Sequence, residues 1–337
     1  MECEKVQSAY PVTAAQKSIY FGHQLDSVGY LYNTGIYSET VGDIDAEALA
    51  HAAKVVLDQA QTLHVNFDID ENGVLVQIPR EHRDWTLDVI DFRGEADPAA
   101  ASDAWMHTKM REPVDLANDL LFTFAVHRVA DNVVRLYQQY HHIIIDGVGL
   151  ALVVGRIAKA YARGVAPDAA AEWTVERYVA ADTEYVGGEQ FQKDREYWLS
   201  ELGDLPQIAH VTDEPLSLAP AVITDSWEID AQRRTRLEEF ARENDLRFSH
   251  VLIALLGSYL ARATNMHDAV FSLPTTARGT RDLRTMPAMV ASVLPLRVHI
   301  SESSTLADVT RSVEAKLWKL LQHGRFRGEV LGKELAE

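Results

Sequence analysis

The sequence predicts an α/β protein with two lobes. Strand-like and helix-like segments alternate in both halves of the chain, which is the pattern of α/β proteins. The 337 residues are enough for two domain-sized cores, and 47% hydrophobic with 24% charged residues is typical of globular proteins. The stretch from Gly164 to Glu172, with Pro167 and several alanines, is typical of a surface connection. We therefore expect an N-terminal lobe over residues 1–170 and a C-terminal lobe over residues 171–337.

The first clear element is a helix over residues 46–60. An apolar stripe recurs there at helical spacing, and it consists of Leu49, Ala53, Val56, Leu57 and Ala60. Asp43 or Asp45 can cap the start of this helix, because a carboxylate there accepts hydrogen bonds from the first free backbone N–H groups.

A β-hairpin and a second helix follow. Residues 121–129 alternate between apolar and polar side chains, residues 130–132 form a turn, and residues 133–140 return as a second strand. After Gly147 the apolar residues recur at helical spacing, at Leu150, Val153, Val154, Ile157 and Tyr161. The segment between these elements is therefore a strand-to-helix junction.

The second half continues the alternation. Helices are expected over residues 230–244 and 249–264, and strands over residues 269–273 and 290–300. No short-period repeat interrupts the pattern.

Composition excludes several classes of protein. The net charge of −18, from 32 basic and 50 acidic residues, repels nucleic acid phosphates, so nucleic acid is not an expected partner. No apolar run approaches the roughly 20 residues that span a bilayer, and the first residues lack a signal-peptide pattern. The single cysteine, Cys3, excludes an intrachain disulfide framework and a cysteine zinc cluster. We expect a cytoplasmic protein without a membrane partner.

The segment from His141 to Gly147 is the most informative one. Adjacent histidines at the end of a buried strand need hydrogen-bond partners, and Asp146 beside three isoleucines needs a cation. Gly147 is expected to permit a sharp turn where a side chain would obstruct it. Because the ordinary pKa of histidine is near 6.5, this pattern fits proton transfer near neutral pH.

Two other interpretations compete on the spacing alone. The histidine pair can be purely structural, with both rings satisfied by neighbours. A metal site is disfavoured, because adjacent residues of a strand point to opposite sides and no third ligand stands at a suitable spacing.

Residues 141–147 match the HHxxxDG motif, and further segments match the same family in the same order. These segments are PVTAAQKSIY at 11–20, Glu184-Tyr185 with FQKDREYWL at 191–199, LPTTAR at 273–278 and PAMVASVLPLR at 287–297. Together they resemble the condensation domains of nonribosomal peptide synthetases over some 300 residues of the chain. Ordered matches of this kind are far more specific than one short motif.

The resemblance implies an architecture and a reaction. The family has two chloramphenicol-acetyltransferase-like lobes in a V shape, and it forms an amide bond between a donor thioester and an acceptor aminoacyl thioester. Both substrates arrive on phosphopantetheine arms of carrier proteins, which raise the local concentration. The implied partners are donor and acceptor carrier proteins, with an adjacent adenylation domain as a further candidate. No metal or cofactor bound by the domain itself is implied.

The resemblance also implies roles for particular residues. His142 faces the active-site tunnel and positions the acceptor amine or accepts its proton, and the choice between these roles stays open. Asp146 is mainly structural and pairs with Arg278. His141 and Gly147 shape the turn, and the backbone near Gly147 is a candidate donor to the oxyanion.

The chain departs from the family pattern at several positions. Ala288 and Ser292 stand where glycine and asparagine are frequent, and residues 61–64 read QTLH in place of E-x-L-R. Residues 147–149 read GVG in place of an aromatic and a serine, which points to an initiating, fatty-acyl or otherwise atypical donor. Complete members extend beyond a chain of this length, so we expect an incomplete second lobe.

Related proteins on the same scaffold provide the alternatives. Epimerisation domains share the motif but carry an EGHGR-like segment that this chain lacks. Heterocyclising relatives have aspartates in place of both histidines. Stand-alone acyltransferases that form esters or amides, and non-catalytic recruitment domains, stay open, since a fold alone does not decide function.

Overall fold

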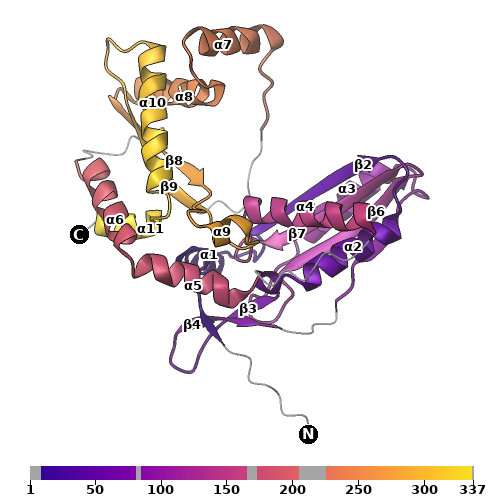
Figure 1. The fold of residues 1–337 in the computed structure, drawn as a ribbon. Helices are drawn as coiled ribbons and strands as arrows, with labels where there is room; N and C mark the ends of the chain where they lie inside the picture. Colours follow the sequence, from indigo (N-terminus) through magenta and orange to yellow (C-terminus); the bar gives the residue numbers. More distant parts are fainter. Residues whose placement is uncertain (1–8, 81–84, 165–172, 205–224, 336–337) are drawn as a thin grey trace. The chain divides into compact units, whose positions relative to one another are not determined.

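The computed structural model describes residues 9–80, 85–164, 173–204 and 225–335 (Figure 1). Helices and strands are mixed along the described residues, which confirms the predicted α/β class, although helices α4 to α8 follow one another without a strand between them. The chain divides into two compact units. Unit 1 comprises Met1–Gly187 and Arg278–Val290, and unit 2 comprises Gly188–Ala277 and Ala291–Glu337.

The main sheet of unit 1 has four strands in the order β2-β7-β6-β5. Their bounds are Asn33–Val41 for β2, Val133–His141 for β7, Phe122–Ala130 for β6 and Asp88–Asp91 for β5. Strands β6 and β7 form the predicted antiparallel hairpin, whose register places Phe122 opposite Tyr140. Strand β2 pairs with the other edge of β7, and β5 runs parallel to β6. The end of β7, where the motif begins, is therefore held between two neighbouring strands.

Three helices pack around this sheet: α2 (Ala46–Asp58), α3 (Pro98–Met110) and α4 (Gly147–Arg163). Asp45 caps α2, since its Oδ1 accepts from the backbone N–H groups of Glu47 and Ala48 at 3.0 Å each. Ala53, Val56 and Leu57 of the predicted stripe lie on the buried face of α2, which contacts β6 and α4. Leu49 is half-buried, and Ala60 is buried just after the helix, which ends two residues before the predicted bound. Trp105 of α3 packs edge-to-face against Tyr137 of β7.

A smaller sheet of unit 1 has three strands in the order β1-β4-β3. It consists of β1 (Tyr10–Pro11), β4 (Leu75–Pro79) and β3 (Val65–Ile69), near η1 (Gln61–Leu63), α1 (Ala14–Gln24) and α5 (Val175–Val186). Thr13 and Gln16 form a capping box at the start of α1. The Gln16 side chain then donates to Gln77 at 3.0 Å, which ties α1 to β4.

Unit 2 is built on the antiparallel pair β8 (Asp268–Thr275) and β9 (Ser292–His299). Its helices are α6 (Glu189–Leu202), α7 (Ala231–Glu243), α8 (Phe248–Thr264), α10 (Leu306–Gln322) and α11 (Gly328–Glu334). The core includes Trp198, Leu294, Val313 and Phe326, each at most 1% exposed. The helices expected at 230–244 and 249–264, and both expected strands, are present.

The division by contacts differs from the boundary expected at residue 170. Helix α5 and residues 278–290, which include α9 (Arg281–Thr285), belong to unit 1. Trp173 Nε1 donates to the Thr285 carbonyl at 2.8 Å, and the Tyr178 hydroxyl donates to the Met289 carbonyl. The expected connection at residues 164–172 lies outside the described residues after Gly164. The V-shaped arrangement of lobes stays a prediction.

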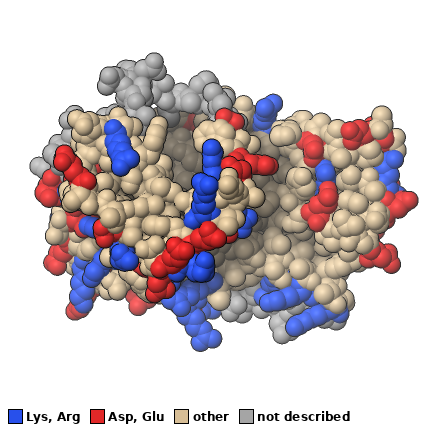
Figure 2. Space-filling model, turned by 90° about the horizontal axis from the view of Figure 1, so that it is seen from above, with Lys and Arg blue, Asp and Glu red and all other residues tan. Residues whose placement is uncertain are grey.

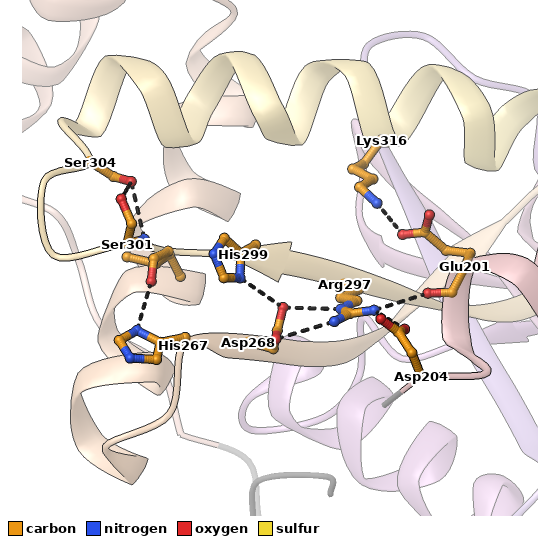
Figure 3. Close-up of polar contacts among 10 residues, drawn as sticks. Glu201, Asp204, His267, Asp268, Arg297, His299, Ser301, Ser304 and Lys316 are labelled. Atoms are coloured by element: carbon orange, nitrogen blue, oxygen red, sulfur yellow. Dashed lines mark hydrogen bonds and ion pairs between the residues drawn. The ribbon is translucent and has the colours of Figure 1, made fainter. Parts of the chain in front are cut away.

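Arg297 organises a polar cluster in unit 2 (Figure 3). Its guanidinium lies 3.0 Å from Asp268 of β8 and 2.6 Å from Asp204, and it donates to the Glu201 carbonyl at 3.3 Å. Hydrogen bonds from Arg297 lower the pKa of Asp268, and His299 contributes to this shift. Arg297, the last residue of the LPLR segment, thus joins the end of α6 to the β8–β9 pair.

We expect Arg297→Met to lower the free energy of unfolding of unit 2 by about 1–3 kcal/mol, because it removes charge-assisted hydrogen bonds from a side chain that is only 17% exposed. Urea denaturation at pH 7 measures the loss. Since the pKa of Asp268 is lowered on folding, the Asp268 contribution is present above the ordinary carboxyl pKa and disappears as pH falls through the lowered value. Arg311→Met, in an exposed pair with Asp308, is the control. Equal losses of unfolding free energy in Arg297→Met and Arg311→Met would contradict the role of Arg297 in joining α6 to the β8–β9 pair.

Candidate active site

The motif occupies the junction between β7 and α4, as predicted. Strand β7 ends at His141 and helix α4 begins at Gly147. Between them, Ile143, Ile144 and Ile145 are at most 4% exposed, so their burial anchors the turn. The junction is thus a fixed piece of backbone from which the polar side chains project.

His142 has a defined tautomer. Its backbone N–H donates to the Tyr32 carbonyl at 2.8 Å, and its ring Nδ1 lies 2.9 Å from the Ile145 carbonyl. Because a carbonyl only accepts hydrogen bonds, the ring proton of neutral His142 resides on Nδ1. Nε2 then carries the lone pair. The side chain is half-buried, which lets this nitrogen serve as a hydrogen-bond acceptor or a base.

His141 is held neutral inside unit 1. It is 1% exposed, its Nδ1 accepts from the Ile143 N–H at 3.3 Å, and its Nε2 lies 3.2 Å from His23 Nδ1. Burial lowers the pKa of His141 to about 3, and the neighbouring His23 and His142 add to the shift. A ring with both nitrogens engaged positions the turn and does not exchange protons at neutral pH.

Asp146 ties the start of α4 to residues 278–290. Its Oδ1 accepts from the Gly149 N–H at 2.8 Å and from Arg278 Nη2 at 2.7 Å. Its Oδ2 accepts from the Val290 N–H at 3.0 Å. Both side chains of the ion pair are at most 4% exposed. The buried carboxylate therefore has the cation it requires, and that cation is Arg278.

The other N–H groups on the two terminal nitrogens of Arg278 hold its own segment in shape. Nη1 donates to the carbonyls of Leu283 and Met286, the latter at 2.7 Å, and Nη2 also donates to the Ala288 carbonyl at 3.1 Å. Residues 278–290 thus wrap around the guanidinium. Ala288, one of the departures from the family pattern, takes part through its backbone.

A second departure, QTLH at 61–64, has structural partners as well. Gln61 Oε1 accepts from the Val175 N–H at 2.9 Å, and Thr62 Oγ1 donates to the Pro287 carbonyl at 2.7 Å. Together with Trp173 and Tyr178, Thr62 fastens residues 278–290 to the rest of unit 1. Sequence reasoning missed these three residues, because each contacts a backbone carbonyl more than 100 positions away.

The expectation that a side chain at Gly147 would obstruct the turn is wrong. A Cβ at Gly147 meets no atom within 4 Å, and Gly147 has no positive φ. The crowded glycine is Gly149, where a Cβ would lie 2.7 Å from Ile145 Cγ1, 3.1 Å from the Ala288 nitrogen and 3.2 Å from Pro287 Cα. The contact that excludes a side chain is two residues further along the chain, in the first turn of α4.

Gly149→Ala is expected to cost about 1–3 kcal/mol of stability, because the new methyl group overlaps Ile145 Cγ1 and lies tightly against the backbone of Pro287 and Ala288. Gly147→Ala is the matched control. It adds the same atom into open space at a helical position, so its unfolding midpoint should equal or exceed that of the wild type. Thermal denaturation compares the two, and an equal effect of both substitutions would contradict the assignment of crowding to Gly149.

The described residues show few other candidate sites. Among them, no three His, Cys, Asp or Glu side chains gather as a metal-ligand set. No described helix has the length and apolar character needed to cross a membrane. On the face drawn in Figure 2, acidic and basic side chains of the described residues intermingle over the surface.

Comparison with known proteins assigns this geometry to a family. The condensation domain family matches residues 6–337. The dimodular nonribosomal peptide synthase of Bacillus subtilis (strain 168) is 31% identical over 330 residues, which are 97% of this chain and 14% of that protein. The isonitrile lipopeptide synthase of Streptomyces coeruleorubidus is 33% identical over 96% of this chain and 22% of its own length. The chain thus spans less than a quarter of these relatives.

Solved structures of single domains are similar over most of their length. The first condensation domain of the calcium-dependent antibiotic synthetase, in complex with a substrate analogue, has a TM-score of 0.86 at 29% identity, covering 97% of this chain and 78% of that one. A mutant starter condensation domain of rhizomide synthetase, in complex with C8-CoA and Leu-SNAC, has a TM-score of 0.86 at 27% identity.

Proposed function

The chain belongs to the condensation-domain family of nonribosomal peptide synthetases, and on that premise we propose that it joins a donor acyl or peptidyl thioester to the amine of an acceptor aminoacyl thioester. In this proposal, both substrates are carried on phosphopantetheine by partner carrier proteins, and an adjacent adenylation domain loads one of them. The domain itself takes no cofactor, and the reaction proceeds in the cytoplasm. The observation that carries the proposal is His142, whose Nε2 lone pair is set by the Nδ1 contact with the Ile145 carbonyl.

The reaction needs no covalent bond to the protein. The acceptor amine attacks the donor thioester carbonyl, the C–N bond forms, and the C–S bond breaks to release the donor thiol. His142 Nε2 accepts a hydrogen bond from the amine and so directs its lone pair toward the carbonyl. The proton lost by nitrogen passes to the leaving thiolate, with Nε2 as the carrier when it acts as a base. Both roles use the same lone pair.

Four further residues support this chemistry, although their side chains do not contact the acceptor amine as His142 does. They are His141, Asp146, Gly147 and Arg278. His141 and the ion pair hold the backbone from which His142 projects. The N–H groups of Gly147 and Val148, the first two of α4, have no acceptor within the helix and suit a developing oxyanion, whereas the Gly149 N–H donates to Asp146. These roles belong to the proposal.

We also propose an initiating acyl donor. Two solved relatives are described as a first and a starter condensation domain, one of them in complex with C8-CoA. A third relative is a lipopeptide synthase. The GVG sequence at residues 147–149 agrees with this donor class, since it replaces the aromatic and serine frequent in the family. Octanoyl and aminoacyl donors, offered in competition, distinguish the two classes.

An intact-mass assay tests the proposal against its alternatives. The 337-residue chain is incubated with donors on one carrier and aminoacyl acceptors on a second. Amide synthesis moves the donor mass to the acceptor carrier. Epimerisation leaves all masses unchanged and inverts the acceptor, which chiral analysis of the released amino acid detects. A stand-alone acyltransferase uses free amines or alcohols equally well, and a recruitment domain binds carriers without any product.

A further inference from the structure

His23, in the last turn of α1, contacts the buried histidine of the motif. His23 Nδ1 lies 3.2 Å from His141 Nε2, and the two rings meet edge to face with centroids 4.9 Å apart. Helix α1 is connected to the motif in this way although 118 positions separate the two residues. Neither the motif nor the proposed reaction so far gives His23 a role.

Backbone groups at both ends of the His141–His23 pair determine which ring nitrogen of each histidine carries the proton. The Ile143 N–H donates to His141 Nδ1, so neutral His141 carries its proton on Nε2 and donates it to His23 Nδ1. The backbone of Val114 raises the pKa of His23, as a carbonyl acceptor near the ring does, and the Val114 N–H already donates to the Gly29 carbonyl at 3.0 Å. We therefore assign the proton of neutral His23 to Nε2, with the Val114 carbonyl as its acceptor. All donors in this chain of hydrogen bonds point the same way.

The chain of hydrogen bonds ends inside the turn that holds His142. Ile143 follows His142 directly, and its N–H is the group that His141 orients. His141 is 1% exposed, and His23 is the acceptor that the folded chain provides for its Nε2–H. If that acceptor is lost, the His141 ring reorients and releases the Ile143 amide, and the direction of the His142 ring changes with it.

We propose that His23 is a positioning residue for acyl transfer, which acts through His141 on the turn that orients His142. This inference rests on the proposed function. It requires His23 to keep a lone pair on Nδ1, whereas a protonated His23 presents an N–H to the N–H of His141.

The groups that face His23 determine the pH range over which its Nδ1 keeps the lone pair. Burial lowers the pKa of His23, while the carboxylates of Asp26 and Asp115 and the Val114 carbonyl raise it to a smaller extent. The remaining neighbour, His141, stays neutral because its own pKa is lowered to about 3. Neutral His23 is therefore the form at pH 7, and the contact breaks as pH falls through its lowered pKa.

Two substitutions test the two ring nitrogens of His23 separately. His23→Asn keeps an acceptor at the position of Nδ1, facing His141, and loses the Val114 contact. His23→Gln keeps a donor at the position of Nε2 and loses the acceptor that faces His141. We expect kcat for acyl transfer to fall about 10- to 100-fold in His23→Gln and by less than about threefold in His23→Asn, with KM for the acceptor carrier unchanged in both.

A readout independent of activity follows the His142 ring itself. The ¹⁵N shifts of His142 report its tautomer, and we expect them to change in His23→Gln and not in His23→Asn. In the wild type the acid limb of the kcat profile should include the protonation of His23, and this contribution should be absent in His23→Asn. Thermal denaturation of all variants checks that the folded fraction is the same.

The outcomes are distinct. An active wild type with equal kcat and equal His142 shifts in both variants overturns the role of His23 and leaves the proposed function intact. Losses that follow only the folded fraction also overturn it. A wild-type chain that transfers no acyl group overturns the proposed function, and the role of His23 with it.

Discussion

We expect His142→Ala to lower the rate of acyl transfer between carriers by about 10²- to 10⁴-fold, the range for loss of a general base. The substitution removes the Nε2 lone pair that orients or deprotonates the acceptor amine. The ring is half-buried and contacts the Ile145 carbonyl at 2.9 Å. Initial rates at saturating acceptor carrier, followed by intact mass, measure the effect.

The pH dependence of the residual rate separates the two roles of His142. A base role predicts that the mutant regains rate at high pH, where more of the amine is free. A positioning role predicts a uniform loss at every pH. His107→Ala, an exposed histidine on α3, is the matched control and should retain the wild-type rate. A His142→Ala rate within tenfold of the wild type would remove His142 from the centre of the mechanism.

Asp146→Ala should cost about 3–5 kcal/mol of folding free energy, the largest stability effect that we expect. The substitution leaves Arg278 as a buried cation at 4% side-chain exposure and removes the acceptor for the Gly149 and Val290 N–H groups. It also removes the cap of α4. Urea denaturation followed by far-UV circular dichroism gives the loss.

A double-mutant cycle identifies the ion pair as the cause. Replacing both partners, as Asp146→Leu with Arg278→Met, removes the unpaired charge, so the double mutant should be more stable than either single mutant. Additive losses in the cycle would show that the two residues act independently. Lys54→Met, in an exposed pair with Asp58, is the surface comparison and should lower stability by no more than about 1 kcal/mol.

Elements with a strong local pattern could be predicted from the sequence. Strand β6 places Phe122, Phe124 and Val126 on one face and is followed by a turn, and α2 has one apolar stripe with an aspartate before it. Strand β2 could not be found in this way. All its residues after Asn33 are exposed, so it has no alternation, and its place in the sheet depends on backbone pairing with β7.

The candidate site was predictable in its chemistry and less so in its packing. The need of a buried Asp146 for a cation follows from its apolar neighbours, and the resemblance implied Arg278 as its partner. The contacts of Thr62 and Tyr178 with residues 278–290 depend on how distant segments meet, which local spacing does not encode. The error at Gly147 has the same origin, because the backbone that crowds Gly149 belongs to Pro287 and Ala288.

The central claim is that this chain transfers an acyl group between two carriers through His142. The most direct measurement is the intact mass of both carriers in one reaction, with wild type and His142→Ala in parallel. We predict that the wild type adds the donor mass to the acceptor carrier as an amide and unloads the donor carrier equally, while His142→Ala leaves both carriers loaded. Unchanged carriers with the wild type, or equal transfer by the mutant, would contradict the claim.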